Sequence, residues 1–204
     1  DGGAIVALDP NDGAVLAMAS SPTYKPSVYV GRVDPKKIEP LVNDTAARKA
    51  NYPGLNRVTQ AEYPPGSTWK PVTALAAMQE HKLAPYESIP CTPTATYGLD
   101  DFEFRNWDPY VNKPMSLSEA MARSCDTYFY EVGYRFYLAG DGGRSRMQEW
   151  AQTFGFGAPT GFGLGAETSG LVPTPAWRKQ AFTSDWDRAW NPGEPLPASH
   201  PFAK

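Results

Sequence analysis

A serine and a lysine three residues apart are the first pair in this sequence that could do chemistry. Ser67 and Lys70 lie in the stretch 63–70, YPPGSTWK, and the chain contains no other Ser-x-x-Lys. Residues three apart on a helix share one face, so the Lys70 amine is expected to reach the Ser67 hydroxyl. A serine next to an amine base is typical of nucleophilic catalysis. The alternative is a capping serine with a lysine that faces solvent.

The local sequence predicts how this pair is held. Two prolines and a glycine break the backbone before Ser67, and the alanine-rich run from Pro71 to Met78 then predicts a helix. Ser67 is therefore expected at the helix start, where its side chain would cap free N–H groups. A negative charge on its oxygen would also be favoured by the helix dipole. The helix is apolar nearly all round, which places it at the centre of a domain.

A second pair, Ser124 and Asp126, belongs to the only Ser-x-Asp or Ser-x-Asn in the chain. The residues Ser116 to Glu119 match a capping box and predict a short helix through Ala122. A further helix is expected over 128–133, so Ser124 and Asp126 would lie on a tight corner between two helices. The alternative is an ordinary capping serine with an aspartate in the first turn.

The remaining elements are predicted from apolar spacing. Apolar runs at 4–8 and 14–18 around turn residues predict a β-hairpin whose sheet is covered on both faces. Residues 43–49 predict a short exposed helix. One buried helical face is expected from Met147 to Phe154, closed by Gly155. Four aromatic residues of a less regular segment are expected to pack over the core: Phe102, Phe104, Trp107 and Tyr110.

Composition excludes several classes of function. The formal charge of −3 over 204 residues makes a nucleic-acid partner unexpected. No apolar run approaches the roughly 20 residues that cross a bilayer. The cysteines, Cys91 and Cys125, and the histidines, His81 and His200, show no zinc-ligand spacing. We expect the cysteines to be buried, inert thiols, with a disulfide as the alternative in an oxidising compartment.

Together the two pairs resemble the penicillin-binding, acyl-serine transferase family, which includes serine β-lactamases and peptidoglycan transpeptidases. The opening hairpin, the approach 63–66, the Asn106-Trp107 segment and the run 124–130 are similar to the transpeptidase domain of class B penicillin-binding proteins. Aspartate at position 126 is more like the elongation-type, penicillin-binding protein 2-like branch. The resemblance covers about residues 3 to 175.

The resemblance implies an α+β fold of the penicillin-binding/serine β-lactamase-like transpeptidase type, incomplete in this chain. The expected parts are a sheet hairpin (1–20), a mainly helical region with both motifs (55–175) and a loop-rich tail (176–204). The family's third motif, Lys-Thr-Gly on a C-terminal strand, is missing, since Pro159-Thr160-Gly161 lacks the basic residue. We therefore expect an internal piece of a longer protein with little or no activity by itself.

The resemblance also implies roles for the four residues. Ser67 would be the nucleophile, Lys70 its general base and Ser124 a proton relay. Asp126 would bind substrate or position the neighbouring site residues. We hypothesise that Lys70 is charged at rest, shared between Asp126 and Ser124, and loses its proton only when substrate excludes water. No metal or other cofactor is implied.

The implied parent is a peptidoglycan D,D-transpeptidase that takes stem peptides, binds β-lactams and works with the cell-wall elongation machinery. It would lie on the outer face of the bacterial cytoplasmic membrane, anchored by a segment absent from this chain. One alternative is a hydrolase, a serine β-lactamase or D,D-carboxypeptidase, which faster deacylation of Ser67 would reveal. Another is a non-catalytic β-lactam sensor or scaffold, which persistent acylation coupled to a partner's response would favour.

Overall fold

The computed structural model describes residues 2–97, 103–163, 165–177 and 180–181. The chain divides into two compact units, one from Asp1–Pro64 and Ala158–Gly170 and the other from Pro65–Gly157 and Leu171–Lys204. All four predicted site residues fall in the second unit. Among the described residues, no helix is long and apolar enough to cross a membrane. The domain boundaries predicted above stay a prediction.

The first unit opens with the predicted hairpin, formed by β1 (Gly3–Leu8) and β2 (Val15–Ser21) in antiparallel register. The expectation that this sheet is covered on both faces is wrong for the described residues. Ile5 is 72% exposed and Leu16 67% exposed. The apolar side chains of a strand show that burying them would be favourable, but they do not show which other segment packs against them.

Two short helices follow in the first unit, after a 3-10 turn η1 (Pro26–Tyr29). The predicted helix is confirmed as α2 (Asp44–Lys49), and the Asn43 side chain caps it by accepting from the Ala46 N–H. The helix α1 (Pro35–Val42) was not predicted, because Pro40 interrupts its pattern.

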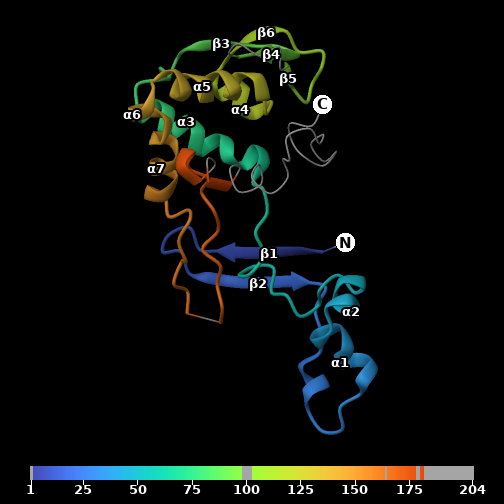
Figure 1. Cartoon of the computed structure of the whole chain (residues 1–204). Helices are drawn as coiled ribbons and strands as arrows, with labels where there is room; N and C mark the ends of the chain where they lie inside the picture. Colours follow the sequence, from blue (N-terminus) through green and yellow to red (C-terminus); the bar gives the residue numbers. More distant parts are fainter. Residues whose placement is uncertain (1, 98–102, 164, 178–179, 182–204) are drawn as a thin grey trace, which may run out of the picture. The chain divides into compact units, whose positions relative to one another are not determined.

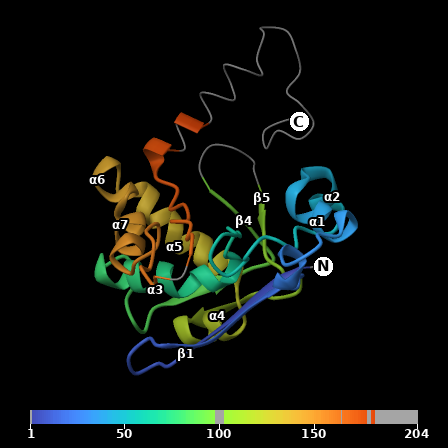
Figure 2. The ribbon, with the colours of Figure 1, turned by 90° about the horizontal axis from the view of Figure 1, so that it is seen from below.

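The second unit is built around α3 (Lys70–Gln79), which contacts both α5 (Asp126–Leu138) and α7 (Arg146–Thr153) (Figures 1 and 2). The prediction of a central apolar helix is confirmed. Its small side chains are fully buried at Ala76 and Ala77, and they allow α5 to come close. Val132 and Tyr128 of α5 are buried in the same core.

Two further helices complete this part of the unit. The predicted helix is confirmed as α4 (Leu117–Ala122), with Ser116 as its N-cap, where the Ser116 hydroxyl accepts from the Glu119 N–H. The Glu119 carboxylate pairs with Lys113 and Arg123, so only this half of the predicted capping box is seen. Beyond the end of α5, α6 (Asp141–Arg144) forms a single turn that contacts α5 and α7. The face predicted for α7 is confirmed for Ala151, which is buried, and for Met147 and Trp150, which pack on the core, but Phe154 is 43% exposed, so for it the prediction is wrong.

Four short strands pair as two separate ladders in the second unit (Figure 1). β3 (Ser88–Cys91) pairs with β6 (Lys113–Ser116), and β4 (Thr94–Thr96) pairs with β5 (Glu103–Arg105). Both β3 and β5 contact α5. They were not predicted because each has at most four residues, too few for a periodic signal.

The expectation for the four aromatic residues holds only in part. Phe104 lies among the rings of Tyr97 and Tyr130. Trp107 and Tyr110 are 66% and 91% exposed, so for them the prediction is wrong. Phe102 lies outside the described residues. The Trp107 backbone N–H and indole N–H donate to Asp126 and to the Arg123 carbonyl, and these bonds leave much of its ring in solvent.

The carboxylate of Glu80 ties the end of α3 to α7, and we expect this tie to weaken in acid. Hydrogen bonds from Arg146 and from the Trp150 indole lower the pKa of Glu80 from 4.5 to about 2. A depressed folded-state pKa gives stability that is present above pH 4.5 and lost as the pH falls toward 2. Urea unfolding of the wild type and Glu80→Gln should therefore differ most at pH 5–7 and least near pH 2. A difference that does not change with pH would contradict this.

Candidate active site

Ser67 lies in a single 3-10 turn, η2 (Gly66–Trp69), that leads directly into α3. Gly66 has φ +56°, a conformation that glycine adopts at little cost, which explains why glycine precedes the serine. The Thr68 hydroxyl donates to the Pro65 carbonyl and steadies the turn. The Ser67 side chain is exposed.

The predicted capping role of Ser67 is wrong. Neither η2 nor α3 has a side-chain cap. The 3-10 turn begins before Ser67 and runs directly into α3, so Ser67 lies inside the turn and not at a capping position. Pro71 in the first turn of α3 also removes one N–H that would need a partner. The Ser67 hydroxyl is therefore free for another contact, and it accepts a hydrogen bond of 2.9 Å from the Ser124 hydroxyl.

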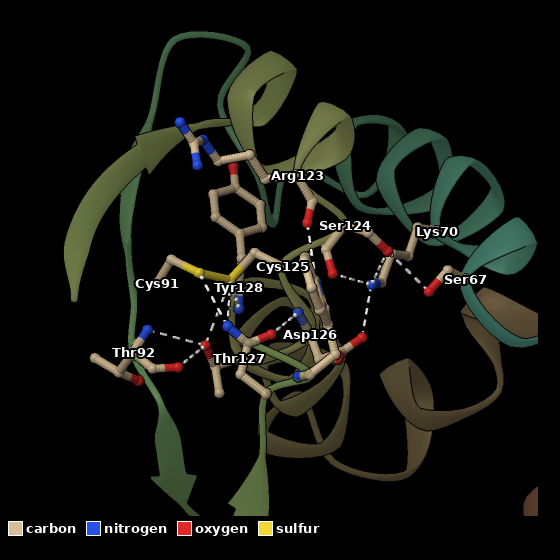
Figure 3. Close-up of polar contacts among 12 residues, drawn as sticks. Ser67, Lys70, Cys91, Thr92, Arg123, Ser124, Cys125, Asp126, Thr127 and Tyr128 are labelled. Carbon is tan, nitrogen blue, oxygen red and sulfur yellow. Dashed lines mark hydrogen bonds and ion pairs between the residues drawn. A yellow bond between two sulfur atoms is a disulfide. The ribbon is translucent and has the colours of Figure 1, made fainter. Parts of the chain in front are cut away.

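Lys70 is buried, with its amine surrounded by oxygen acceptors (Figure 3). Nζ donates to the Ser124 carbonyl at 2.7 Å, the Ser124 hydroxyl at 2.9 Å and Asp126 Oδ1 at 2.6 Å. Three acceptors match the three N–H donors of a charged ammonium. The Phe129 ring lies 5.6 Å from the same amine, which adds a cation–π contact.

The predicted direct contact between Lys70 and Ser67 is not found. Among the described residues, the Lys70 amine makes no hydrogen bond to Ser67 and reaches it through the Ser124 hydroxyl. Because a lysine ammonium can only donate, Ser124 Oγ accepts from Lys70 and gives its own hydrogen to Ser67. The two motifs are thus joined in one chain of hydrogen bonds.

Ser124 occupies the predicted corner between α4 and α5, and its backbone is unusual. Its φ of +54° lies in the left-handed region, which is uncommon for a residue with a side chain. Such a conformation costs on the order of 1–3 kcal/mol and persists only when its surroundings enforce it. Here it turns both the carbonyl and the hydroxyl of Ser124 toward Lys70 (Figure 3).

Asp126 is the first residue of α5 and divides its carboxylate between two partners. Oδ1 accepts from Lys70, and Oδ2 accepts from the Trp107 backbone N–H at 3.0 Å. Burial and this negative charge raise the pKa of Tyr130. The side chains of Lys70 and Asp126 are 10% and 22% exposed, so their ion pair is shielded from water.

The cysteines form a disulfide, which corrects the expectation of inert thiols. Cys91, at the end of β3, is bonded to Cys125, immediately before α5. Nothing in the sequence favoured a disulfide over two free thiols, because the two cysteines are brought together by strand β3, which was not predicted. The bond lies next to Ser124 and Asp126 (Figure 3).

Two residues that were not predicted as site residues hold this corner. Asn106 is buried, and its Oδ1 accepts from the Asp126 backbone N–H at 2.9 Å. The Trp107 indole N–H donates to the Arg123 carbonyl at 3.0 Å. The adjacent Asn-Trp pair is visible in the sequence, but no local signal shows that it meets a helix start some 20 residues later.

The described residues contain no cluster of histidine, cysteine and acidic side chains that could hold a metal ion. The site presents an exposed serine hydroxyl, linked through a second hydroxyl to a buried amine. Such a linked set can move a proton away from a serine that attacks a carbonyl carbon.

Comparison with known proteins shows the family of this chain. Residues 3–185 match the family model for the penicillin binding protein transpeptidase domain. The peptidoglycan D,D-transpeptidase MrdA of Haemophilus influenzae is 35% identical over 184 residues, which are 90% of this chain and 27% of that protein. The chain thus spans about a quarter of the length of the curated relatives it matches.

Solved structures show the same fold. The structure of penicillin-binding protein PBP2 of Pseudomonas aeruginosa, in complex with WCK 5153, has a TM-score of 0.75 and 33% identity, covering 95% of this chain and 40% of that chain. PBP2 of Helicobacter pylori, solved in complex with MreC, gives a TM-score of 0.76 and 29% identity, with coverages of 91% and 32%. With a family model matched over most of its length, this chain belongs to the penicillin-binding protein transpeptidase family.

Proposed function

We propose that this chain supplies the nucleophile side of a peptidoglycan D,D-transpeptidase that works through an acyl-serine intermediate on Ser67. The observation that carries the proposal is the continuous set of hydrogen bonds from Ser67 through Ser124 and Lys70 to Asp126. The name shared by the curated relatives, peptidoglycan D,D-transpeptidase, supports the reaction class.

In the proposed mechanism, Ser67 is the nucleophile and Lys70 its general base. The hydrogen bonds at rest run the wrong way for this step, because Lys70 donates to Ser124 and Ser124 donates to Ser67. Attack requires the reverse order. We infer that Lys70 releases its extra proton to solvent as substrate enters, after which Ser67 donates to Ser124 and Ser124 donates to the neutral amine.

The proton balance of the two half-reactions follows from this order. Ser67 Oγ bonds to the penultimate D-alanine carbonyl carbon of a stem peptide, and its proton passes through Ser124 to Lys70. The C–N bond to the terminal D-alanine breaks, and the leaving amine takes that proton back along the same route. An amine of a neighbouring strand then attacks the carbonyl carbon of the acyl-serine and gives up one proton to Lys70. The C–O bond to Ser67 breaks, and that proton returns through Ser124 to Ser67 Oγ. Asp126 keeps the Lys70 amine against Ser124 throughout.

The proposed setting is the outer face of the bacterial cytoplasmic membrane, within the cell-wall elongation machinery. A solved complex between penicillin-binding protein PBP2 and MreC in Helicobacter pylori supports a partner of this kind for the related protein. β-Lactams are proposed to acylate Ser67 because they mimic the D-alanyl-D-alanine end.

The test is to incubate the full-length protein that carries this chain with penicillin and to map the product by mass spectrometry. One penicillin mass on the peptide that contains Ser67 is expected, and an unmodified protein or an adduct elsewhere would contradict the proposal. The lifetime of the adduct separates the reactions, because a hydrolase would lose it within its turnover time while a transpeptidase retains it.

The 204-residue chain alone should acylate about a hundred- to a thousandfold more slowly than the full-length protein. The resemblance assigns one of the two oxyanion N–H groups to the Lys-Thr-Gly strand, which this sequence lacks, and losing one such donor typically costs that much. Rates with a fluorescent penicillin would measure the ratio. Robust labelling of the isolated chain that disappears in Ser67→Ala would contradict it.

A further inference from the structure

The segment Cys91-Thr92 is attached to the corner on both sides of Asp126. Cys91 forms the disulfide with Cys125, the residue before Asp126. Thr92 exchanges two hydrogen bonds with Thr127, the residue after it. The Thr92 N–H donates to Thr127 Oγ1 at 3.0 Å, and that hydroxyl donates back to the Thr92 carbonyl at 2.9 Å.

Asp126 itself points the other way, toward Lys70 (Figure 3). Its neighbours Cys125 and Thr127 are 1% and 2% exposed, so the attachment is buried while the carboxylate faces the site. The disulfide and the threonine pair therefore fix the backbone of the corner without touching any group that reacts.

Asn106 connects this attachment to the site. Its side-chain amide lies against both sulfurs, 3.5 Å from Cys91 Sγ and 4.0 Å from Cys125 Sγ, and its oxygen accepts from the Asp126 N–H. Asn106 thus contacts the disulfide with one end of its amide and the first residue of α5 with the other. A change at the sulfurs would reach Asp126 through the Asn106 side chain as well as through the backbone of Cys125.

The corner needs such a restraint because Ser124 is held in the left-handed region. Without enforcement, the backbone at Ser124 would relax toward a commoner conformation. Relaxation would move the carbonyl and the hydroxyl of Ser124 away from Lys70, and the hydroxyl away from Ser67.

We propose that the Cys91–Cys125 disulfide, with Thr92, Thr127 and Asn106, is a positioning brace that sets the Ser124–Asp126 corner for acylation of Ser67. This rests on the proposed function. The brace is expected to act on the rate of the chemical step rather than on penicillin binding. A displacement of about 1 Å can cost up to a hundredfold in rate, and we expect about a tenfold loss when the disulfide is absent.

The test compares the full-length wild type with the double variant Cys91→Ser, Cys125→Ser and with Thr127→Val. The matched control is Val132→Ala, which weakens the buried core of the same helix without touching the brace. Folding is checked by thermal melting, and all rates are measured at a temperature where each variant is folded. Thr127→Ser, which keeps the hydroxyl, should retain the wild-type rate.

The brace predicts that the saturating acylation rate falls in the double variant and in Thr127→Val while the penicillin dissociation constant changes little. Val132→Ala should keep the wild-type rate despite its lower melting temperature. A folded double variant with the wild-type rate would overturn the proposal. So would a rate loss in Val132→Ala as large as that in the double variant.

A second measurement decides the inference even if penicillin does not acylate the wild type, which would refute only the proposed function. The Trp107 indole N–H donates to the Arg123 carbonyl beside the corner, so its NMR signal reports the position of that backbone. Trp107→Phe assigns the signal. The signal should move when the disulfide is removed and stay in place in Val132→Ala, and an unmoved signal in the double variant would overturn the brace.

Discussion

Replacing Ser67 with alanine should abolish covalent labelling of the full-length protein by penicillin. The Ser67 hydroxyl is exposed at the end of the hydrogen-bonded chain, where a substrate carbonyl can approach it, whereas the Ser124 hydroxyl lies between two partners. Without Ser67 Oγ no acyl-enzyme can form at this position. The variant should fold normally, because Ser67 caps no helix. Intact mass after incubation is the measurement.

The control for Ser67 is Thr68→Ala, which removes the neighbouring hydroxyl in the same turn. Among the described residues, its hydroxyl bonds only to the Pro65 carbonyl, so labelling at Ser67 should be retained. A persistent adduct in the Ser67 variant would show that another hydroxyl, such as that of Ser124, can act as the nucleophile. Peptide mapping would then identify that residue.

All four residues of the candidate site could be singled out from the sequence, because each belongs to a short local pattern. The structure brings them together, and their catalytic roles stay predictions. Ser67 with Lys70, and Ser124 with Asp126, are set by spacings of three and two residues at breaks before helices. No local pattern shows the order in which these four side chains are joined by hydrogen bonds. The approach of α5 to α3 placed the Ser124 hydroxyl between Lys70 and Ser67 instead of leaving the lysine and serine in direct contact.

The support of the site was harder to predict, because it depends on pairings distant in the sequence. Cys91 and Cys125 are 34 residues apart, and they meet because the short strand β3 packs against α5. Asn106 and Trp107 reach the start of α5 from the end of β5. Strands of three or four residues carry no readable period, so neither meeting is visible in composition or spacing.

The fold shows the same division between local and distant information. The N-cap at Ser116 and the helices α2, α3 and α7 follow from local periodicity and caps, and they were predicted. The cover of the opening hairpin and the packing of Trp107 depend on which segments come together. For both, apolar or aromatic composition suggested burial that the described residues do not provide.

The second large effect is expected at Lys70, where replacement by alanine should slow acylation by about a hundred- to ten-thousandfold, the usual contribution of a general base. The change also removes the positively charged partner of the Asp126 carboxylate, a side chain that is only 22% exposed. A loss of activity in Lys70→Ala alone therefore does not separate a base from a structural counter-ion. Melting temperature must be recorded with the acylation rate.

Lys70→Arg makes that separation, because arginine keeps the positive charge beside Asp126 but does not lose its proton in proteins. If Lys70 is the base, the arginine variant should recover stability relative to alanine while acylation stays slow. Lys82→Ala is the matched control. Like Lys70, Lys82 places its amine over an aromatic ring, here 5.5 Å from the centre of the Phe136 ring, but it lies outside the site. Near wild-type acylation in Lys70→Arg would show that Lys70 serves only as a counter-ion, and the base would then have to be sought elsewhere around Ser67.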